Sequence, residues 1–597
     1  MARLLDCNPL TLHYVYFIAI SVIGSVIIYM TSMPISDLQY ADASFMSFSA
    51  MTGTGLNVVS LSSLTAVQQG TIFTLFILGH AIPILGVLSF VRGRTLCSIQ
   101  REAAHNEHPT RPSNQGLHEA LYEKGVSPPK AIPSLEFKPK VVASLAKVSI
   151  IGEHEPRKEE DCTIITDLTN PSQIQQFVIA DEKRKIKNRG SIIPRTFLRL
   201  KIAVRVLKGY LSWKVPNGLP ESDEVECRAL FFLSGFILLY FITFLSFGIL
   251  ILGLSLRFYY PEVPLSYGVS PFWAGAFLAT SAFVNNGMSL IDTDMAAFQR
   301  DFAPLLICSV LILAGNTLFP CLLRLFIWSG KHLLPQKPKW QIWRQTLDFA
   351  LENSQKVVCS SLYPTWHTWF LLGTILVLNS IMWGAFELAS IQDEEIRSLP
   401  GVNRALDGLF QSLSVRGGGF SVVAFSKLPQ GLLILYVSAA IGRSTKFSEK
   451  HQKDISSIEK GDLISNTSTK NQYHPRLAQG WFLYQQLRSQ FSHDIWWLSL
   501  TILFISIAES DHYKAEPVSF STFNIIFEVV SAYSCVGASI GYPGKNYAFC
   551  GEWHTFSKIL LLAVSLKGRL RGVSIAMNRT NLLHRSPTRI PEEDLKL

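Results

Sequence analysis

Four short apolar segments that end in glycine are the parts of this chain best suited to binding an ion that has shed its water. Each is roughly ten to fifteen residues long, which is too short to cross a membrane and too apolar for a solvated loop. We interpret each as a half-helix that enters the membrane and turns at glycine. Irregular backbone at membrane depth persists only where it lines protein or a wet cavity. The segments are 43–55, 271–287, 402–419 and 523–537.

Such segments could replace the water shell of a permeating ion with backbone oxygens. Rings of carbonyl groups do this when they all point at one axis. The required backbone is closed to residues with a Cβ, which explains glycine at each turn. The carboxyl end of each short helix also carries partial negative charge, which favours a cation nearby. One such glycine is weak evidence, but four of them, each between two long apolar blocks, predict a cation pathway.

The rest of the chain has the composition of a membrane-embedded scaffold. Of its 597 residues, 48% are hydrophobic and only 16% are charged, and the mean hydropathy is +0.25. Soluble proteins have nearer to 25% charged residues. Eight apolar blocks are candidates to cross a bilayer, which takes roughly 20 residues of helix, although the last three are short or interrupted by polar residues. They are 11–30, 70–91, 229–254, 304–328, 366–388, 428–442, 495–508 and 555–566.

The formal charge of +10 reports topology rather than nucleic-acid binding. Lysine and arginine concentrate in 92–228, 329–365, 444–488 and 567–589, whereas the alternate connections contain only a handful. The positive-inside rule places the basic segments, and therefore both termini, in the cytoplasm. The glycine-ended segments then all approach from outside.

The predicted fold is an all-α polytopic membrane protein with four membrane–pore-loop–membrane units. About eight transmembrane helices and four re-entrant helices would surround one central pore. The units are 1–92, 229–329, 364–443 and 493–572. They are joined by a long and largely disordered cytoplasmic loop at 93–228, a linker at 330–363 and a loop at 444–492, and are followed by a tail at 573–597. Within the long loop, the basic stretch 195–208 could lie on the inner leaflet or form a solvated helix.

Several segments resemble fungal Trk potassium transporters of the Trk/Ktr/HKT superfamily. The run from Phe527 to Tyr533, followed by Val536-Gly537 and by 539–544, is similar to their fourth pore loop. Other matching segments are Ser281-Ala282-Phe283 with Asn286-Gly287, Gly315-Asn316-Thr317 with Phe319-Pro320, Arg228-Ala229-Leu230, and 567–572. The likeness covers the spans and the glycine-ended loops, which make up about two thirds of the chain.

This resemblance implies a selectivity filter and a function. The chain is expected to take up potassium across the plasma membrane. Because the sequence has no ATP-binding motif, the expected driving force is the membrane potential. In the superfamily, glycine at all four filter positions goes with potassium and serine at the first favours sodium, so Gly55 implies potassium. The resemblance also implies a homo-oligomer, a dimer. The implied filter residues are Thr54, Gly55, Asn286, Gly287, Gly418, Gly419, Val536 and Gly537.

Departures from the family pattern keep two alternatives open. The third loop has Gly417-Gly418 where the family has Thr-Ala, which would loosen the turn and admit sodium or a mixture of potassium and sodium. The fourth loop has Ser534-Cys535 in place of Gly-Thr. The sixth span stops at Gly442 without the expected proline, and the segment after Gly572 lacks Leu-Pro. These changes would also fit a non-conducting membrane sensor or scaffold derived from a transporter.

Five further residues are candidates to line or gate the pathway. The resemblance implies that Lys567, Arg569 and Arg571, at the end of the last span, face the pathway; the alternative is that they anchor the helix at the cytoplasmic surface. Glu528 either tunes cation binding or accepts bonds from neighbouring backbone. Asn316, with Pro320, marks either a gate or a packed kink.

We find no motif of an enzyme, a cofactor or a transition-metal site. No P-loop, dinucleotide fingerprint or hydrolase elbow occurs. Glu153-His154-Glu155 lacks the pair of histidines found in zinc motifs. The expected partners are therefore K⁺, with Na⁺ or Rb⁺ as possible substitutes, and the lipid bilayer, but not nucleic acid.

Overall fold

The computed structural model describes residues 9–32, 38–107, 221–352, 362, 365–390, 397, 400–441 and 495–570. Within these residues the secondary structure is entirely helical, with no strand. The chain divides into two compact units, Met1–Gly93 with Val225–Leu597, and Arg94–Glu224. Apart from the end of α5 and the start of α9, the features below belong to the first unit. Of the second unit the structure describes only 94–107 and 221–224.

Within the described ranges, four helices are each long and apolar enough to cross a membrane: α2 (Pro9–Met30), α5 (Ala81–Glu107), α9 (Glu221–Phe258) and α15 (Thr365–Ser390). A fifth candidate is a bent pair, α12 (Phe302–Gly315) and α13 (Phe319–Leu333), whose axes meet at 82°. The chain is therefore a multi-pass membrane protein, as its composition predicts. Much of the apolar surface of these helices is exposed, which suits contact with lipid.

The remaining predicted spans coincide with shorter helices. These are α18 (Gln430–Ile441), the helix 495–508 and α23 (Thr555–Leu570), and each borders residues outside the described ranges. The second predicted span, 70–91, is divided at His80 into α4 (Ala66–Gly79) and α5. The count of eight spans stays a prediction. The predicted loop 93–228 is helical at both of its described ends, and the basic stretch 195–208 lies outside the described residues.

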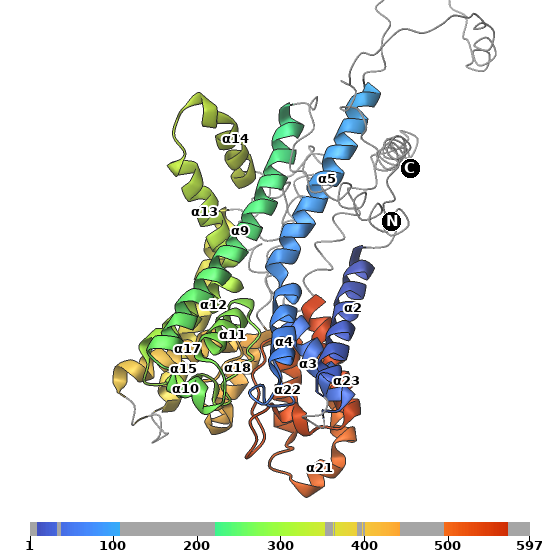
Figure 1. Cartoon of the computed structure of the whole chain (residues 1–597), viewed down its shortest axis with the longest axis vertical. Helices are drawn as coiled ribbons and strands as arrows, with labels where there is room; N and C mark the ends of the chain where they lie inside the picture. The colour runs from blue at the N-terminus through green and yellow to red at the C-terminus, as the bar shows by residue number, and fades with distance from the viewer. Residues whose placement is uncertain are drawn as a thin grey trace, which may run out of the picture. The chain divides into compact units, whose positions relative to one another are not determined.

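The four glycine-ended segments form four short helices. They lie in the same band of the molecule in Figure 1 and their C-terminal halves are buried. Each packs against the helix that follows it: α3 against α4, α11 against α12, α17 against α18 and α22 against α23. Side chains such as Phe277 and Phe410 are fully buried here. The short helices are α3 (Tyr40–Thr52), α11 (Pro271–Val284), α17 (Gly401–Val415) and α22 (Thr522–Ser534).

Short elements complete the described part of the chain. Three are α-helical: α10 (Glu262–Ser266), α14 (Pro338–Glu352) and α21 (Ser510–Ala515). Three are 3₁₀ turns: η2 (Asp294–Phe298), η3 (Phe425–Lys427) and η4 (Phe549–Glu552). The turns η2, η3 and η4 follow the second, third and fourth short helices and lead toward the next long helix.

A candidate ion-conduction site

Four glycines, one after each short helix, lie next to one another in a closed ring. All four have a left-handed backbone, which glycine adopts without steric cost. We call them the glycine ring, and we call the segments around them loop 1 (53–57), loop 2 (285–289), loop 3 (416–421) and loop 4 (535–541). The ring consists of Gly55 (φ 82°), Gly287 (φ 93°), Gly419 (φ 74°) and Gly537 (φ 86°).

Each ring glycine faces the carbonyl group of the residue that precedes the next ring glycine. A Cβ added to Gly55 would lie within 3.0 Å of the Asn286 oxygen, so a side chain there would collide with backbone. A Cβ on Gly537 would likewise meet the oxygen of Thr54, which closes the ring from loop 4 back to loop 1. The two remaining pairs are Gly287 with Gly418 and Gly419 with Val536.

The structure therefore brings together all eight filter residues predicted from the sequence. The carbonyl groups of Thr54, Asn286, Gly418 and Val536 each lie against the ring glycine of a neighbouring loop, and the four loops follow one another in chain order. An arrangement of this kind offers a cation several backbone oxygens at once. The amino-acid sequence predicted the members of the ring, whereas their order around it is a finding of the structure.

Loops 1, 2 and 4 share one helix-ending motif. The residue after the short helix is left-handed, its N–H donates to the carbonyl three residues back, and the next N–H donates to the carbonyl five residues back. This pair of bonds is the Schellman motif, which satisfies carbonyls at a helix C-terminus. The bonds are Gly53 to Ala50 (3.4 Å) and Thr54 to Ser49 (3.0 Å), Asn285 to Ala282 (3.2 Å) and Asn286 to Ser281 (2.9 Å), and Cys535 to Ala532 (3.1 Å) and Val536 to Ser531 (3.1 Å).

Loop 3 ends its helix differently. Arg416, which follows α17, has a right-handed helical backbone (φ −83°, ψ −15°). The three N–H groups of Gly417, Gly418 and Gly419 all donate to the single carbonyl of Ser414, at 2.9, 2.7 and 2.9 Å. One acceptor thus serves three donors, and only Gly419 of the three has positive φ. The extra glycines allow the backbone to reach the ring without the left-handed residue used by the other loops.

In loops 1, 2 and 4, a glycine of the helix that follows lets that helix pack directly against the end of the short helix. A Cβ on Gly79 would meet the carbonyl of Met51, four residues before the ring glycine. The corresponding pairs are Gly315 with the carbonyl of Phe283 and Gly568 with the carbonyl of Tyr533. The short helices are therefore held by direct backbone contact, which leaves their ends little room to move.

A cavity of about 830 Å³ opens directly over the glycine ring. Its wall includes all four ring glycines and two carboxylates of the segment after loop 2, Asp292 and Asp294. Asp292 accepts bonds from the hydroxyls of Ser60 (2.7 Å) and Ser62 (3.0 Å), which follow loop 1, and from the amide of Asn546 (3.3 Å), which follows loop 4. Negative charge in a concave site raises the local concentration of cations.

Asp294 connects the same segment to loop 3. Its Oδ2 accepts bonds from the backbone N–H of Ser421 (2.5 Å) and from the Ser421 hydroxyl (3.2 Å). Asp294 lies in η2, in the connection between loop 2 and α12 and outside the spanning helices. Burial raises its pKa to about 7, against the opposing effect of the two bonds from Ser421. The charge of this carboxyl therefore changes near neutral pH.

The structure shows the surroundings of two of the gating candidates, Asn316 and Glu528. Asn316 forms the 82° break between α12 and α13, directly after Gly315, which contacts the end of α11. Glu528 is fully buried in α22, and its Oε1 accepts a bond from the backbone N–H of Cys550 (3.2 Å). For Glu528 this is the backbone-bonded arrangement, one of its two predicted alternatives.

The basic residues at the end of the last span have different surroundings. Arg569 donates to the carbonyl of Gly79 (2.6 Å), and its guanidinium lies beside Gly53, at the base of loop 1. The ammonium of Lys567 instead lies over the ring of Trp497, 4.0 Å from its centroid. Arg571 lies outside the described residues. Of the three, Arg569 is the residue that the structure brings next to the loops.

Sequence reasoning missed several residues that hold the ring. The carboxylates Asp292 and Asp294 lack a recognisable motif, because their partners are more than 120 residues away. A local sequence signal did exist for the helix-ending motif that loops 1, 2 and 4 share. Each has Ser-Ala six and five residues before its ring glycine, at Ser49-Ala50, Ser281-Ala282 and Ser531-Ala532, whereas loop 3 has Leu413-Ser414.

The fold and the ring together define a class, the multi-pass membrane transport proteins. Within that class the family is given by sequence comparison. A model of the TrkH family, described as cation transport protein, matches residues 212–587, which is more than half of the chain. The chain therefore belongs to the TrkH family of cation transport proteins, and the predicted resemblance to the Trk/Ktr/HKT superfamily is confirmed.

Individual relatives agree with this assignment. The chain is 32% identical over 422 residues to the low-affinity potassium transport protein of Saccharomyces cerevisiae, covering 63% of this chain and 46% of that protein. It is 30% identical over 406 residues to potassium transporter TRK1 of Candida albicans (64% and 37%). It is 27% identical over 389 residues to cation transporter HKT1;3 of Oryza sativa subsp. japonica (62% and 66%).

A solved structure was also matched. The crystal structure of the potassium transporter TrkH from Vibrio parahaemolyticus aligns with a TM-score of 0.44 and 13% identity, covering 97% of this chain and 85% of that one. The chain spans less than half the length of the two fungal relatives described above.

Proposed function

We propose that this protein takes up potassium across the plasma membrane, with the glycine ring as its selectivity filter. The observation that carries the proposal is the closed cycle of four loops, in which each ring glycine faces the carbonyl group of the next loop. Carbonyl oxygens held in this way can replace the hydration shell of K⁺. The fungal relatives named as potassium transport proteins support the choice of ion.

The finer architecture belongs to the same proposal. The four short helices, each packed against the helix that follows it, are the pore helices of four membrane–pore-loop–membrane units around one pore. Eight spans and cytoplasmic termini then place the 830 Å³ cavity at the extracellular mouth, where Asp292 and Asp294 attract cations. Arg569 lies at the other end of loop 1, on the cytoplasmic side of the filter. The protein works as a homo-oligomer, a dimer, and needs no cofactor beyond the transported ion.

The membrane potential would supply the driving force. Moving one charge is worth about 2.3 kcal/mol per 100 mV. A potential of about 200 mV therefore supports roughly thousandfold accumulation, since about 1.4 kcal/mol corresponds to a factor of ten. Uptake driven this way requires a filter that binds the ion weakly at several positions, so that the ion can leave.

Rubidium uptake in cells that lack their own potassium uptake tests the proposal. The full chain is compared with Gly537→Asp, which places a side chain against the carbonyls of Thr54 and Asn286. The matched control is Gly268→Ala, because Gly268 also has positive φ (71°) but no atom within 4 Å of an added Cβ. We expect uptake by the wild type and the control and none by Gly537→Asp.

If the wild type reaches the cell surface and takes up no rubidium, the transport proposal fails. The non-conducting sensor or scaffold is then the correct interpretation. If Gly537→Asp transports like the wild type, the ring is not the filter, whatever the wild type transports.

Sodium is the second candidate ion, and the structure of loop 3 is the observation that favours it. Three consecutive glycines bonded to one carbonyl give this quarter of the ring more freedom than the other three. Competition by sodium during rubidium uptake distinguishes the two ions. Gly55→Ser sharpens the test: the added Cβ fits only if loop 1 withdraws from Asn286, so we expect slower rubidium uptake and stronger sodium competition.

A further inference from the structure

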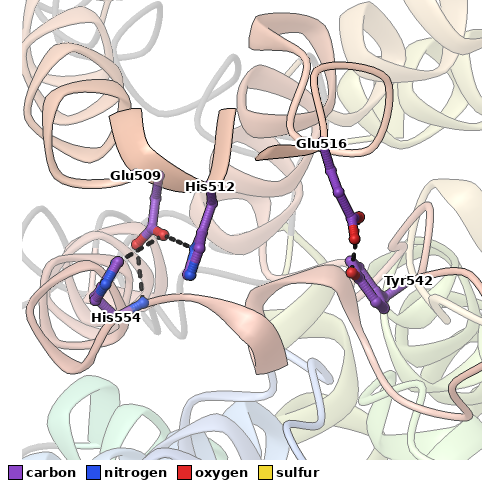
Figure 2. A network of polar contacts seen from close by, with 5 residues as sticks. All are labelled: Glu509, His512, Glu516, Tyr542 and His554. Carbon is purple, nitrogen blue, oxygen red and sulfur yellow. Dashed lines mark hydrogen bonds and ion pairs between the residues drawn. The ribbon is translucent and has the colours of Figure 1, made fainter. Parts of the chain in front are cut away.

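Three side chains outside the glycine ring converge between the last two long helices. Glu509 directly follows the helix 495–508, His512 lies in α21, and His554 directly precedes α23. Figure 2 shows both imidazole rings turned toward the Glu509 carboxylate. The Nδ1 atom of His512 lies 2.8 Å from Oε2 of Glu509, and that of His554 lies 3.0 Å from the same oxygen.

The carboxylate is held in place before any ligand binds. Glu509 is buried, with 1% of its side chain exposed, although it sits at the end of a helix. Its other oxygen, Oε1, accepts a bond from the backbone N–H of His554 at 2.9 Å. Oε2 is thereby left to face the two imidazoles. A buried carboxylate with two histidines is a common way for proteins to bind a divalent transition metal.

The two histidines are free to adjust to an ion. Their rings stack with centroids 4.5 Å apart, and 37% of the His512 side chain and 50% of the His554 side chain are exposed. The three ligand atoms lie within 4.8 Å of one another. Ligands of a tetrahedral Zn²⁺ at bond lengths of about 2.0–2.1 Å are about 3.3 Å apart. The two distances from Oε2 of Glu509 to the histidine nitrogens, 2.8 and 3.0 Å, must therefore lengthen by only a few tenths of an ångström to admit the ion.

We propose that Glu509, His512 and His554 form a binding site for a divalent transition-metal ion, with Zn²⁺ as the best fit. The ligands are Oε2 of Glu509 and the Nδ1 atoms of two neutral imidazoles whose protons reside on Nε2. Two nitrogens and one carboxylate oxygen suit zinc better than calcium or magnesium, which prefer oxygen alone. Water from the exposed side completes the coordination.

This proposal departs from the sequence-based expectation that the chain has no transition-metal site. Motif searches detect ligands that are close in sequence, but Glu509 and His554 are 45 residues apart. Only the packing of the helix 495–508 and α21 against the start of α23 brings them together.

The metal site is connected to loop 4 through α21. Glu516, which caps the C-terminus of α21, accepts a bond from the hydroxyl of Tyr542 (2.7 Å), just beyond loop 4 (Figure 2). On the other side, the His512 ring contacts Phe520, and Phe520 contacts Phe549. The N–H of Phe549 in turn donates to the hydroxyl of Ser539 (2.9 Å), two residues after Gly537. A bound ion therefore restrains the segments that enter and leave loop 4.

This connection predicts that Zn²⁺ binding affects transport. The prediction rests on the proposed function. With Zn²⁺ bound, we expect slower rubidium uptake, because loop 4 contributes one quarter of the glycine ring. In Tyr542→Phe the hydroxyl bond to Glu516 is lost while the three ligands remain. That variant should bind Zn²⁺ like the wild type and lose part of the inhibition.

Direct binding to the purified full-length protein tests the site without any need for transport. Zn²⁺ is titrated by calorimetry into the wild type and into the double variant His512→Asn/His554→Asn. Asparagine keeps a hydrogen-bond donor near the position of Nδ1 but is a poor zinc ligand, so folding is preserved. We expect the double variant to bind one Zn²⁺ fewer, or to bind it at least about 100-fold more weakly, since even loss of an outer-shell partner costs about 10- to 100-fold.

His332→Asn is the matched control, because His332 is an exposed histidine in α13 far from the cluster in sequence. It should leave Zn²⁺ binding unchanged. Equal Zn²⁺ binding by the wild type and the double variant overturns the proposal, as does the absence of binding by the wild type. Zn²⁺ binding by a protein that transports no rubidium would contradict the proposed function and leave the metal site standing.

Discussion

Loops 1, 2 and 4 are built alike, and loop 3 reaches the same ring by another route. The first three end their helices in a left-handed residue with two bonds to two carbonyls, and a glycine of the following helix braces each one. Loop 3 relies on three glycines and on the single carbonyl of Ser414. The ring glycine itself has the same left-handed backbone in all four. The position of the filter backbone is therefore common to the four loops, whereas the means of holding it is not.

The difference suggests where stiffness and adaptability lie. A left-handed residue other than glycine costs roughly 1–2 kcal/mol, and Asn285 and Cys535 both accept that cost. The surrounding contacts must therefore hold loops 2 and 4 firmly. Loop 3 has no strained residue of this kind and is anchored from outside by Asp294. We expect selectivity to be set by three stiff loops and adjusted by the fourth.

The largest expected effect is a difference in rubidium uptake between alanine variants of a ring glycine and of an extra glycine in loop 3. Gly537→Ala should reduce rubidium uptake to background, because its Cβ meets backbone oxygens that cannot move away. Gly418→Ala should keep measurable uptake, because the atoms nearest to its Cβ belong to the side chains of Ile312 and Phe420, which can shift more easily than backbone. Rubidium influx, normalised to surface protein, measures both. Equal loss in the two variants would contradict the distinction.

The next effect tests the glycines that brace the three similar loops. Gly315→Ala and Gly568→Ala should each destabilise the protein by about 1–3 kcal/mol, the usual range for overpacking. Gly384 in α15 has no atom within 4 Å of an added Cβ, so Gly384→Ala serves as the control. It should be neutral or stabilising by up to about 1 kcal/mol, because alanine favours a helix. The melting temperature of the purified protein measures all three.

A smaller effect concerns the anchor of loop 3 and depends on pH. The pKa of Asp294 is raised to about 7, above the value near 3.8 of an unperturbed aspartate. Between pH 4 and 7 the folded protein therefore binds more protons at this carboxyl than the unfolded chain, and stability falls as pH rises through that window. Asp294→Asn should remove this part of the pH dependence. Melting temperatures of both proteins from pH 5 to 8 measure it; parallel curves would refute the assignment.

The smallest expected effect compares three serines that precede ring glycines. The hydroxyls of Ser49 and Ser414 each donate at 2.7 Å to the carbonyl just after a ring glycine, Leu56 and Phe420 respectively. Replacing either by alanine should cost about 1 kcal/mol of stability, a typical value for one hydrogen bond. The hydroxyl of Ser281 is buried without a bond in the described structure, so Ser281→Ala should cost less. A larger cost for Ser281→Ala than for Ser49→Ala would reverse the ranking.

The sequence was sufficient to predict the features that repeat locally. Apolar blocks near 20 residues predicted the long helices, and short apolar stretches ending in glycine predicted the four short helices and the ring. The resemblance to one family supplied the residue before each glycine. Each of these signals lies within a few residues, because helix formation and turns depend mainly on near neighbours.

Other features could not be predicted because they depend on distant contacts. The break at His80 divides a largely apolar block, and Gly79 and Pro83 beside it are helix-breaking residues that also occur within intact membrane-spanning helices, so they did not distinguish a break from a continuous span. The bonds that Asp292 and Asp294 accept cross between loops, and the cluster of Glu509, His512 and His554 joins two helix ends. Long-range packing of this kind leaves no periodic pattern in one sequence. The different ending of loop 3 was visible as extra glycines, but its bonding to Ser414 was not.

The measurement that tests the central claim most directly is the location of bound rubidium in an experimental structure of the protein. Crystals grown with Rb⁺ give an anomalous signal that marks the ion without ambiguity. We predict rubidium at the glycine ring, in contact with the carbonyls of Thr54, Asn286, Gly418 and Val536. A ring that is empty under these conditions, with rubidium bound elsewhere between the spans, would contradict the account.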